Sequence, residues 1–122
     1  MGFRALTVAV LVATGCAQPN GGGRANPLAA SPAAATQGEK LFASMNCDGC
    51  HGGGAIGFAA PSLVDGRWRY GGEDSIVFRS IAGGRPRGMP AFGSLLDDRT
   101  IWQLVTYLRS QPVPSAVPTQ AW

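Results

Sequence analysis

The chain has 122 residues, and its 10 lysines and arginines exceed its 7 aspartates and glutamates, which gives a formal net charge of +3. This length accommodates one small domain, and so mild a positive charge argues against a nucleic-acid-binding protein. Because the chain contains 18 glycines and 9 prolines and only 14% charged residues, we expect many turns and a limited apolar core.

The first 16 residues resemble an export signal. Arg4 supplies a positive charge near the start, and residues 5–13 form an apolar run that is too short to span a bilayer. The Ala-Thr-Gly-Cys sequence that ends at Cys16 resembles a bacterial lipobox, although its first position holds alanine where leucine is usual. We expect a lipid on Cys16 to hold the protein at a membrane surface; ordinary cleavage after Ala17 is the alternative.

Residues 17–35 are rich in glycine, alanine, proline, serine and asparagine and show no apolar periodicity, which favours a flexible tether. Thr36 and Glu39 then have the spacing of a capping box, and apolar residues follow at helical intervals. This pattern predicts a first helix from about residue 37 to residue 46. The main domain would therefore span residues 36–110.

The pentapeptide Cys47-Asp48-Gly49-Cys50-His51 comes next. Cys-x-x-Cys-His is the attachment sequence of a c-type haem, in which both thiols form thioethers and the histidine can ligate iron. A thioredoxin-like motif would need a βαβ pattern, which is missing here. A structural zinc site would need four Cys or His ligands, and Cys16 is the one other residue of either type. We predict one covalent haem c, whose porphyrin would supply much of the core.

After a glycine-rich loop come Pro61 and Leu63, which we include among the candidate haem contacts. Trp68 and Tyr70 follow, and the N–H and O–H groups of such side chains suit a half-buried site beside an acceptor such as a haem propionate. Ordinary core packing is the alternative for both aromatic residues. A short helix is then expected from about residue 73 to the two glycines at 83 and 84.

The stretch from Arg85 to Phe92 reads Arg-Pro-Arg-Gly-Met-Pro-Ala-Phe and predicts a stiff loop bracketed by prolines. Met89 therefore lies outside any apolar helical face, and its thioether is a soft ligand suited to haem iron. Met45 lies on the attachment side, close to the cysteines, and is expected to pack in the core. We predict that His51 and Met89 are the two iron ligands.

The final helix is expected to begin with Asp97 or Asp98 as its N-cap and to end before Pro112. Its apolar face would consist of Ile101, Leu104, Val105 and Leu108. Residues 111–122 are rich in proline and predict an extended tail.

Together these motifs resemble the class I cytochromes c, which are small all-α monohaem electron carriers. The resemblance covers residues 36–110 and implies that the N- and C-terminal helices cross, while short helices and loops wrap one covalent haem. In that family a glycine of the first helix meets an aromatic residue of the last, and Gly38, Phe42 and Tyr107 match. The family also has a proline carbonyl that accepts a hydrogen bond from the ligand histidine, and Pro61 matches it.

The resemblance implies a one-electron carrier on the periplasmic side of the membrane rather than an enzyme. It would act, as a monomer, between a dehydrogenase or quinol-oxidising complex and a terminal oxidase or another acceptor. Several arginines could neutralise propionates or line a docking rim for these redox partners: Arg67, Arg69, Arg85 and Arg87. Two alternatives remain open. One is a haem-based sensor or peroxidase-like enzyme with an open iron site, and the other is a permanent haem subunit of a larger complex.

Overall fold

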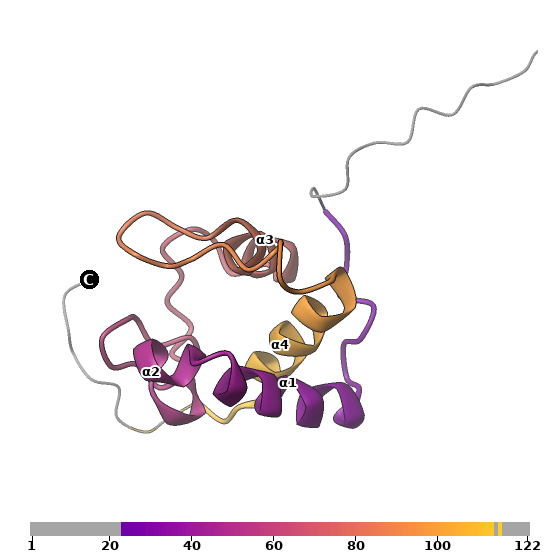
Figure 1. Cartoon of the computed structure of the whole chain (residues 1–122). Helices are drawn as coiled ribbons and strands as arrows, with labels where there is room; N and C mark the ends of the chain where they lie inside the picture. The colour runs from indigo at the N-terminus through magenta and orange to yellow at the C-terminus, as the bar shows by residue number, and fades with distance from the viewer. Residues whose placement is uncertain (1–22, 114, 116–122) are drawn as a thin grey trace, which may run out of the picture.

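The computed structural model describes residues 23–113 and residue 115, and Figure 1 shows their arrangement. The elements are α1 (Pro32–Ser44), α2 (Cys47–His51), the one-turn 3-10 helix η1 (Gly53–Ala55), α3 (Asp74–Gly83) and α4 (Asp98–Ser110). Among the described residues there is no β-strand, and the β-type pairing consists of one isolated antiparallel bridge between Arg85 and Met89. The all-α prediction is therefore confirmed.

α1 and α4 cross with their backbones in direct contact, and α4 also packs against α3 (Figure 1). Gly38 lies at the crossing. A Cβ atom built on this glycine would come within 2.1 Å of the Gln103 carbonyl oxygen and 2.6 Å of the Tyr107 Cβ, so no larger residue fits there. The rings of Phe42 and Tyr107 pack beside it with their centroids 5.3 Å apart. The crossing expected from the resemblance is confirmed.

α4 provides the centre of the apolar core. Its N-cap is Asp97, whose carboxylate accepts a hydrogen bond of 2.8 Å from the Thr100 backbone N–H. Hydrogen bonding from the Thr100 side chain, and then from its backbone N–H, lowers the pKa of the Asp97 carboxyl below its ordinary value, because it stabilises the charged form. The four residues of the predicted apolar face are all buried: Ile101, Leu104, Val105 and Leu108. Both the cap and the face follow the prediction.

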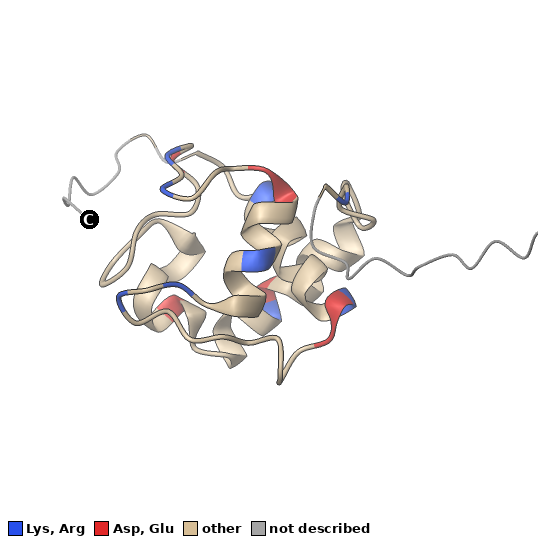
Figure 2. Ribbon diagram, turned by 90° about the horizontal axis from the view of Figure 1, so that it is seen from above, with Lys and Arg blue, Asp and Glu red and all other residues tan. Residues whose placement is uncertain are grey.

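Charged residues are distributed over several elements (Figure 2). Basic residues lie on α3, on the loop before it and on the loop after it, and acidic residues lie close to some of them. Arg109 of α4 and Asp74 of α3 form an ion pair of 2.7 Å. The four arginines considered for docking or for propionates therefore lie in the two loops that flank α3.

α1 begins earlier than the capping-box pattern indicated, and that prediction is wrong. Its N-cap is Ser31, whose hydroxyl accepts a hydrogen bond of 3.2 Å from the Ala34 N–H, and Pro32 is the first helical residue. Proline is well suited to this position because its fixed φ matches the helix and it lacks an N–H that would need a partner. The Thr36 hydroxyl instead donates to the Pro32 carbonyl from within the helix. Three alanines between these residues extend the helix at low conformational cost.

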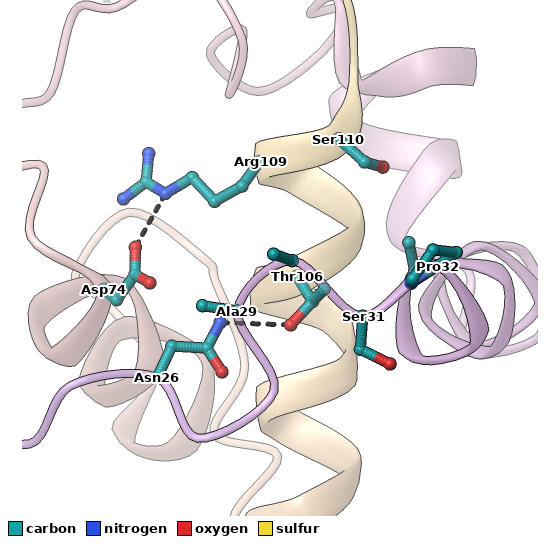
Figure 3. A pocket seen from close by; sticks show the side chains of 10 residues that line it. Asn26, Ala29, Ser31, Pro32, Asp74, Thr106, Arg109 and Ser110 are labelled. Atoms are coloured by element: carbon teal, nitrogen blue, oxygen red, sulfur yellow. Dashed lines mark hydrogen bonds and ion pairs between the residues drawn. The ribbon is translucent and has the colours of Figure 1, made fainter.

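The N-terminal segment before α1 also packs on the domain, so residues 26–35 do not form the flexible tether that was predicted for residues 17–35. Asn26 is buried, and its amide donates to the Thr106 hydroxyl of α4 over 3.0 Å (Figure 3). Its carbonyl oxygen accepts from the Leu28 N–H over 2.9 Å. The Thr106 hydroxyl lies 2.9 Å from the Trp102 carbonyl oxygen and 3.3 Å from that of Leu28. These bonds attach the segment to the face of α4.

The predicted leader, the candidate lipid site at Cys16 and most of the predicted C-terminal tail lie outside the described residues. Within residues 23–113, no helix combines the length and the apolar character that crossing a membrane requires.

Candidate haem site

The Cys-x-x-Cys-His sequence forms the short helix α2. Asn46 separates α2 from α1 by adopting a left-handed conformation (φ +58°), which asparagine tolerates better than most residues. Cys47 and Cys50 are three residues apart on one helical turn, so they lie on the same side of α2. Both cysteines are free thiols; Cys47 is half-buried and Cys50 is exposed. This spacing suits attachment of one planar group through two bonds.

His51 ends α2 and is half-buried. Its Nδ1 lies 2.8 Å from the Pro61 carbonyl oxygen. Because a carbonyl can only accept, Nδ1 carries the hydrogen and Nε2 retains the lone pair that can bind a metal. The pairing expected from the resemblance is thus present in the structure, although the role of His51 as an iron ligand remains a prediction.

The loop after α2 is folded back by backbone hydrogen bonds, which bring Pro61 to the histidine. The Gly57 N–H donates to the His51 carbonyl over 2.7 Å, and the Ala60 N–H donates to the Cys50 carbonyl over 2.8 Å. Burial lowers the pKa of His51, and the bond to Pro61 opposes this effect. The imidazole is therefore held neutral and oriented, as a metal ligand requires.

The thiol of Cys47 is not activated. Burial raises its pKa, and the nearby Asp48 carboxylate adds to the effect. A redox-active Cys-x-x-Cys pair depends on a thiol whose pKa is lowered. The electrostatics of α2 therefore fit a site of covalent attachment better than a thiol–disulfide exchange site.

Met89 lies in a loop that folds back on the end of α3, as the prolines predicted. The Arg85 N–H donates to the Met89 carbonyl over 3.1 Å, and the Phe92 N–H donates to the Ile81 carbonyl over 3.0 Å. Gly84 starts the loop with φ +69°, and a Cβ atom there would come within 2.6 Å of the Met89 carbonyl oxygen. Glycine is required here by both its φ and the close approach. Met89 itself is half-buried against the core.

The predicted donors thus come from two separate parts of the molecule. In Figure 1 the loop after α3 runs along the side of the molecule away from α2, and the segment between η1 and α3 connects them. Leu63 lies in this connecting segment, half-buried against the core, with its N–H donating to the Ala55 carbonyl over 2.9 Å.

The two candidate aromatic residues each face an arginine. The guanidinium carbon of Arg109 lies 4.9 Å from the Trp68 ring centroid, and that of Arg85 lies 4.1 Å from the Tyr70 ring centroid. Trp68 is half-buried against the core, whereas Tyr70 is 42% exposed. The sequence analysis missed Arg109 as a partner, because no local pattern pairs a residue of α4 with Trp68.

The donor types of these segments fit a covalent haem. One helical turn carries two free thiols and an imidazole whose second nitrogen is engaged, and a separate constrained loop carries a thioether. Imidazole and thioether are the donors that tune haem iron in electron-transfer proteins. The residues that would hold the group are therefore Cys47, Cys50, His51 and Met89.

Residues 33–108 match the protein family described as cytochrome c oxidase, cbb3-type, subunit III, and the match covers more than half of the chain. The chain belongs to this family of c-type cytochromes. It is 37% identical over 92 residues to the cbb3-type oxidase subunit CcoP of Azospirillum brasilense, covering 70% of this chain and 31% of that protein. It is 39% identical over 79 residues to the subunit FixP of Bradyrhizobium diazoefficiens, covering 62% and 27%. This cytochrome therefore spans less than a third of either relative.

Solved structures of class I cytochromes c have the same fold. Cytochrome cL of Methylophaga aminisulfidivorans superposes with a TM-score of 0.64 at 30% identity, covering 69% of this chain and 57% of that one. Cytochrome c6 of the diatom Phaeodactylum tricornutum superposes with a TM-score of 0.50 at 29% identity, covering 61% and 88%. The family resemblance read from the motifs and the class I fold are both confirmed.

A separate hollow of about 410 Å³ lies between the N-terminal segment and α4, and neither Cys47 nor Cys50 lines it (Figure 3). Its polar side chains engage one another, with Asn26 bonded to Thr106 and Arg109 bonded to Asp74. Across the part of the chain that the structure describes, every buried polar side-chain atom has a hydrogen-bond partner. The hollow therefore presents no unpaired buried group to a ligand.

Proposed function

We propose that this cytochrome carries single electrons through one covalent haem, whose iron His51 and Met89 would ligate. The observation that carries the proposal is the hydrogen bond between His51 Nδ1 and the Pro61 carbonyl. It leaves Nε2 as the metal-binding nitrogen of a histidine that shares one turn with two free thiols. When bound, the haem supplies the Fe(III)/Fe(II) couple.

The polypeptide would hold the two iron-ligating side chains in fixed positions and would determine which donor atoms the iron receives. The Pro61 carbonyl holds the imidazole in one tautomer and orientation, and backbone bonds hold the Met89 loop against α3. Donors that keep their positions in both oxidation states limit reorganisation during electron transfer. A methionine paired with a histidine favours the reduced iron and raises the potential. Such a site suits a protein that accepts electrons from a dehydrogenase or a quinol-oxidising complex.

We further propose a terminal oxidase as the electron acceptor, because the two relatives described above are subunits of cbb3-type oxidases. The same relatives also support a second candidate role, in which the protein is a permanent haem subunit of a larger complex rather than a monomeric shuttle. Solubilising membranes and purifying the tagged chain distinguishes the two. Oxidase subunits at a constant molar ratio would indicate a subunit, and a monomeric cytochrome on gel filtration would indicate a shuttle.

For localisation we propose the periplasmic side of the membrane, with a lipid on Cys16 as the anchor. The support is the signal-like leader and the lipobox-like sequence that ends at this cysteine. The variant Cys16→Ser is expected to move the protein from the membrane fraction to the soluble periplasmic fraction. Retention of this variant in the membrane would contradict the lipid anchor.

The visible spectrum of the ferric protein tests the site. The wild type is expected to show a weak far-red sulfur-to-iron band, which Met89→Ala removes, and the reduced wild type should not bind carbon monoxide until Met89 is replaced. The mass of a form of the protein that starts after Cys16 should exceed the mass of its polypeptide by one haem. Ready binding of carbon monoxide by the wild type would indicate an open iron site. The proposed function would then be that of a ligand sensor or a peroxidase-like enzyme rather than an electron carrier.

A further inference from the structure

The side chain of Arg85 links the Met89 loop to two other segments. Its Nε donates to the Ser80 hydroxyl over 2.9 Å, and its guanidinium carbon lies 4.1 Å from the centroid of the Tyr70 ring. The Ser80 hydroxyl in turn donates to the Ile76 carbonyl over 2.9 Å, so this serine is oriented by α3. One arginine therefore connects the loop to α3 and to the segment before α3.

The backbone of the same residue holds Met89. The Arg85 N–H donates to the Met89 carbonyl, and this pair forms the antiparallel bridge at the base of the turn. Beyond the bridge, Arg87 and Gly88 have φ values of +77° and +103°, which mark the tip of the turn. The Met89 backbone cannot move away from Arg85 without opening the bridge, and the Arg85 side chain fixes one side of that bridge.

We propose that Arg85 is a positioning residue that, through Ser80 and Tyr70, keeps the sulfur of Met89 on the haem iron. This inference rests on the proposed function, because it takes Met89 as an axial ligand. It assigns to Arg85 a role in ligand retention that is separate from charge compensation of a propionate. Tyr70 supplies the face on which the guanidinium rests, and Ser80 supplies the acceptor for Nε.

Arginine is suited to this role and lysine is not. A planar guanidinium can donate from Nε while its face rests on an aromatic ring. A lysine has a methylene group at the position of Nε and carries its charge on a single ammonium at the end of a flexible stem, so it does not replace the bond to Ser80. Arg85→Lys therefore keeps the positive charge and removes the combined contact, whereas Arg85→Gln removes the charge as well.

The test is a titration of the ferric, haem-loaded protein with imidazole, which competes with Met89 for the iron. Loss of the far-red band reports displacement of the methionine. We expect Arg85→Lys to raise the apparent imidazole affinity about tenfold, because a hydrogen bond to a charged group is lost. Ser80→Ala should raise it about fivefold, and Tyr70→Leu about threefold. The matched control is Arg99→Lys on α4, which should leave the affinity within about twofold of the wild type.

Pairing the variants tests whether the three residues act as one unit. Adding Ser80→Ala to Arg85→Lys should raise the imidazole affinity no further, because the shared contact is already gone. Independent, multiplying effects would overturn the proposal. Since Ser80→Ala removes a single hydroxyl from a partly buried site, it keeps the test decisive even if an Arg85 variant attaches haem poorly.

The remaining outcomes separate this inference from the proposed function. If Met89→Ala retains the far-red band, the axial-ligand assignment fails. If Met89→Ala loses the band while Arg85→Lys and Ser80→Ala both titrate like the wild type, the positioning role of Arg85 is wrong, but the proposed electron-carrier function is unaffected. If only Arg85→Gln differs from the wild type, the charge of Arg85 matters and its contacts do not, which also overturns the inference.

Discussion

The crossing of α1 and α4 and the surroundings of the Met89 loop are stabilised in different ways. At the crossing, backbones touch around Gly38, and Ile101 of α4 is 1% exposed. Around the loop, the contacts include backbone hydrogen bonds and the Arg85–Tyr70 pair, and Tyr70 is 42% exposed. The crossing is therefore held by close backbone packing, while the loop is held by more exposed, polar contacts that can tune a ligand.

The largest effect is expected from a cavity at the centre of the core. Ile101→Ala should lower the free energy of unfolding by about 3 to 4 kcal/mol, since the site is fully enclosed and can collapse little. Denaturant unfolding of the haem-loaded protein, followed by far-UV circular dichroism, measures this change. A loss below about 1 kcal/mol would contradict a fully enclosed, tightly packed site at Ile101.

Overpacking the crossing should have the next largest effect. Gly38→Ala is expected to cost about 2 to 3 kcal/mol, because the added methyl group meets the backbone of α4 rather than a movable side chain. Gly83→Ala at the end of α3 is the matched control, since a Cβ there meets nothing within 4 Å. The control should be neutral or stabilising by up to about 1 kcal/mol. Equal losses in the two variants would contradict a specific contact at Gly38.

A smaller effect is expected on the polar side. Asp74→Asn removes one partner of the Arg109 ion pair, whose side chains are 27% and 36% exposed respectively. The loss should be about 0.5 kcal/mol and should fade as salt is added. The same salt series should leave the effect of Ile101→Ala unchanged. If the loss of unfolding free energy in Asp74→Asn did not depend on ionic strength, the ion pair would be shielded from solvent in the way that the buried contacts are.

The smallest effect concerns the exposed cap of α4, and pH reveals it. Hydrogen bonds from the side chain and the backbone of Thr100 lower the pKa of Asp97 in the folded state, so the stabilisation is complete above the ordinary carboxyl pKa of about 4. It is lost as the pH falls through the lowered folded value. The stability difference between the wild type and Asp97→Ala should therefore be constant from pH 7 to pH 5 and shrink below pH 4. A difference that persists to pH 2 would mean that the charge of Asp97 does not contribute.

The sequence predicted best those features that depend on neighbouring residues. Asp97 as a cap and the face around Ile101 were read correctly because capping and helical periodicity are local properties. The predicted start of α1 was wrong because two nearby sequence patterns both favour a helix N-terminus. Thr36 and Glu39 have capping-box spacing, and Ser31 followed by Pro32 is an equally good N-cap and first helical residue. The alanines between them can extend the helix, and packing of the N-terminal segment on α4 accompanies the earlier start.

By itself, then, the sequence determined the attachment motif, the two candidate iron ligands and the class I cytochrome fold, since spacing along the chain carries that chemistry. The tertiary structure decided which distant side chains meet. Asn26 and Thr106 are 80 positions apart, and the same composition would have served a flexible tether. Arg85 could equally have faced solvent or a propionate, and its contacts with Ser80 and Tyr70 exist because the loop folds back onto α3. Long polar side chains have many rotamers and no periodic pattern, so only the packed structure selects their partners.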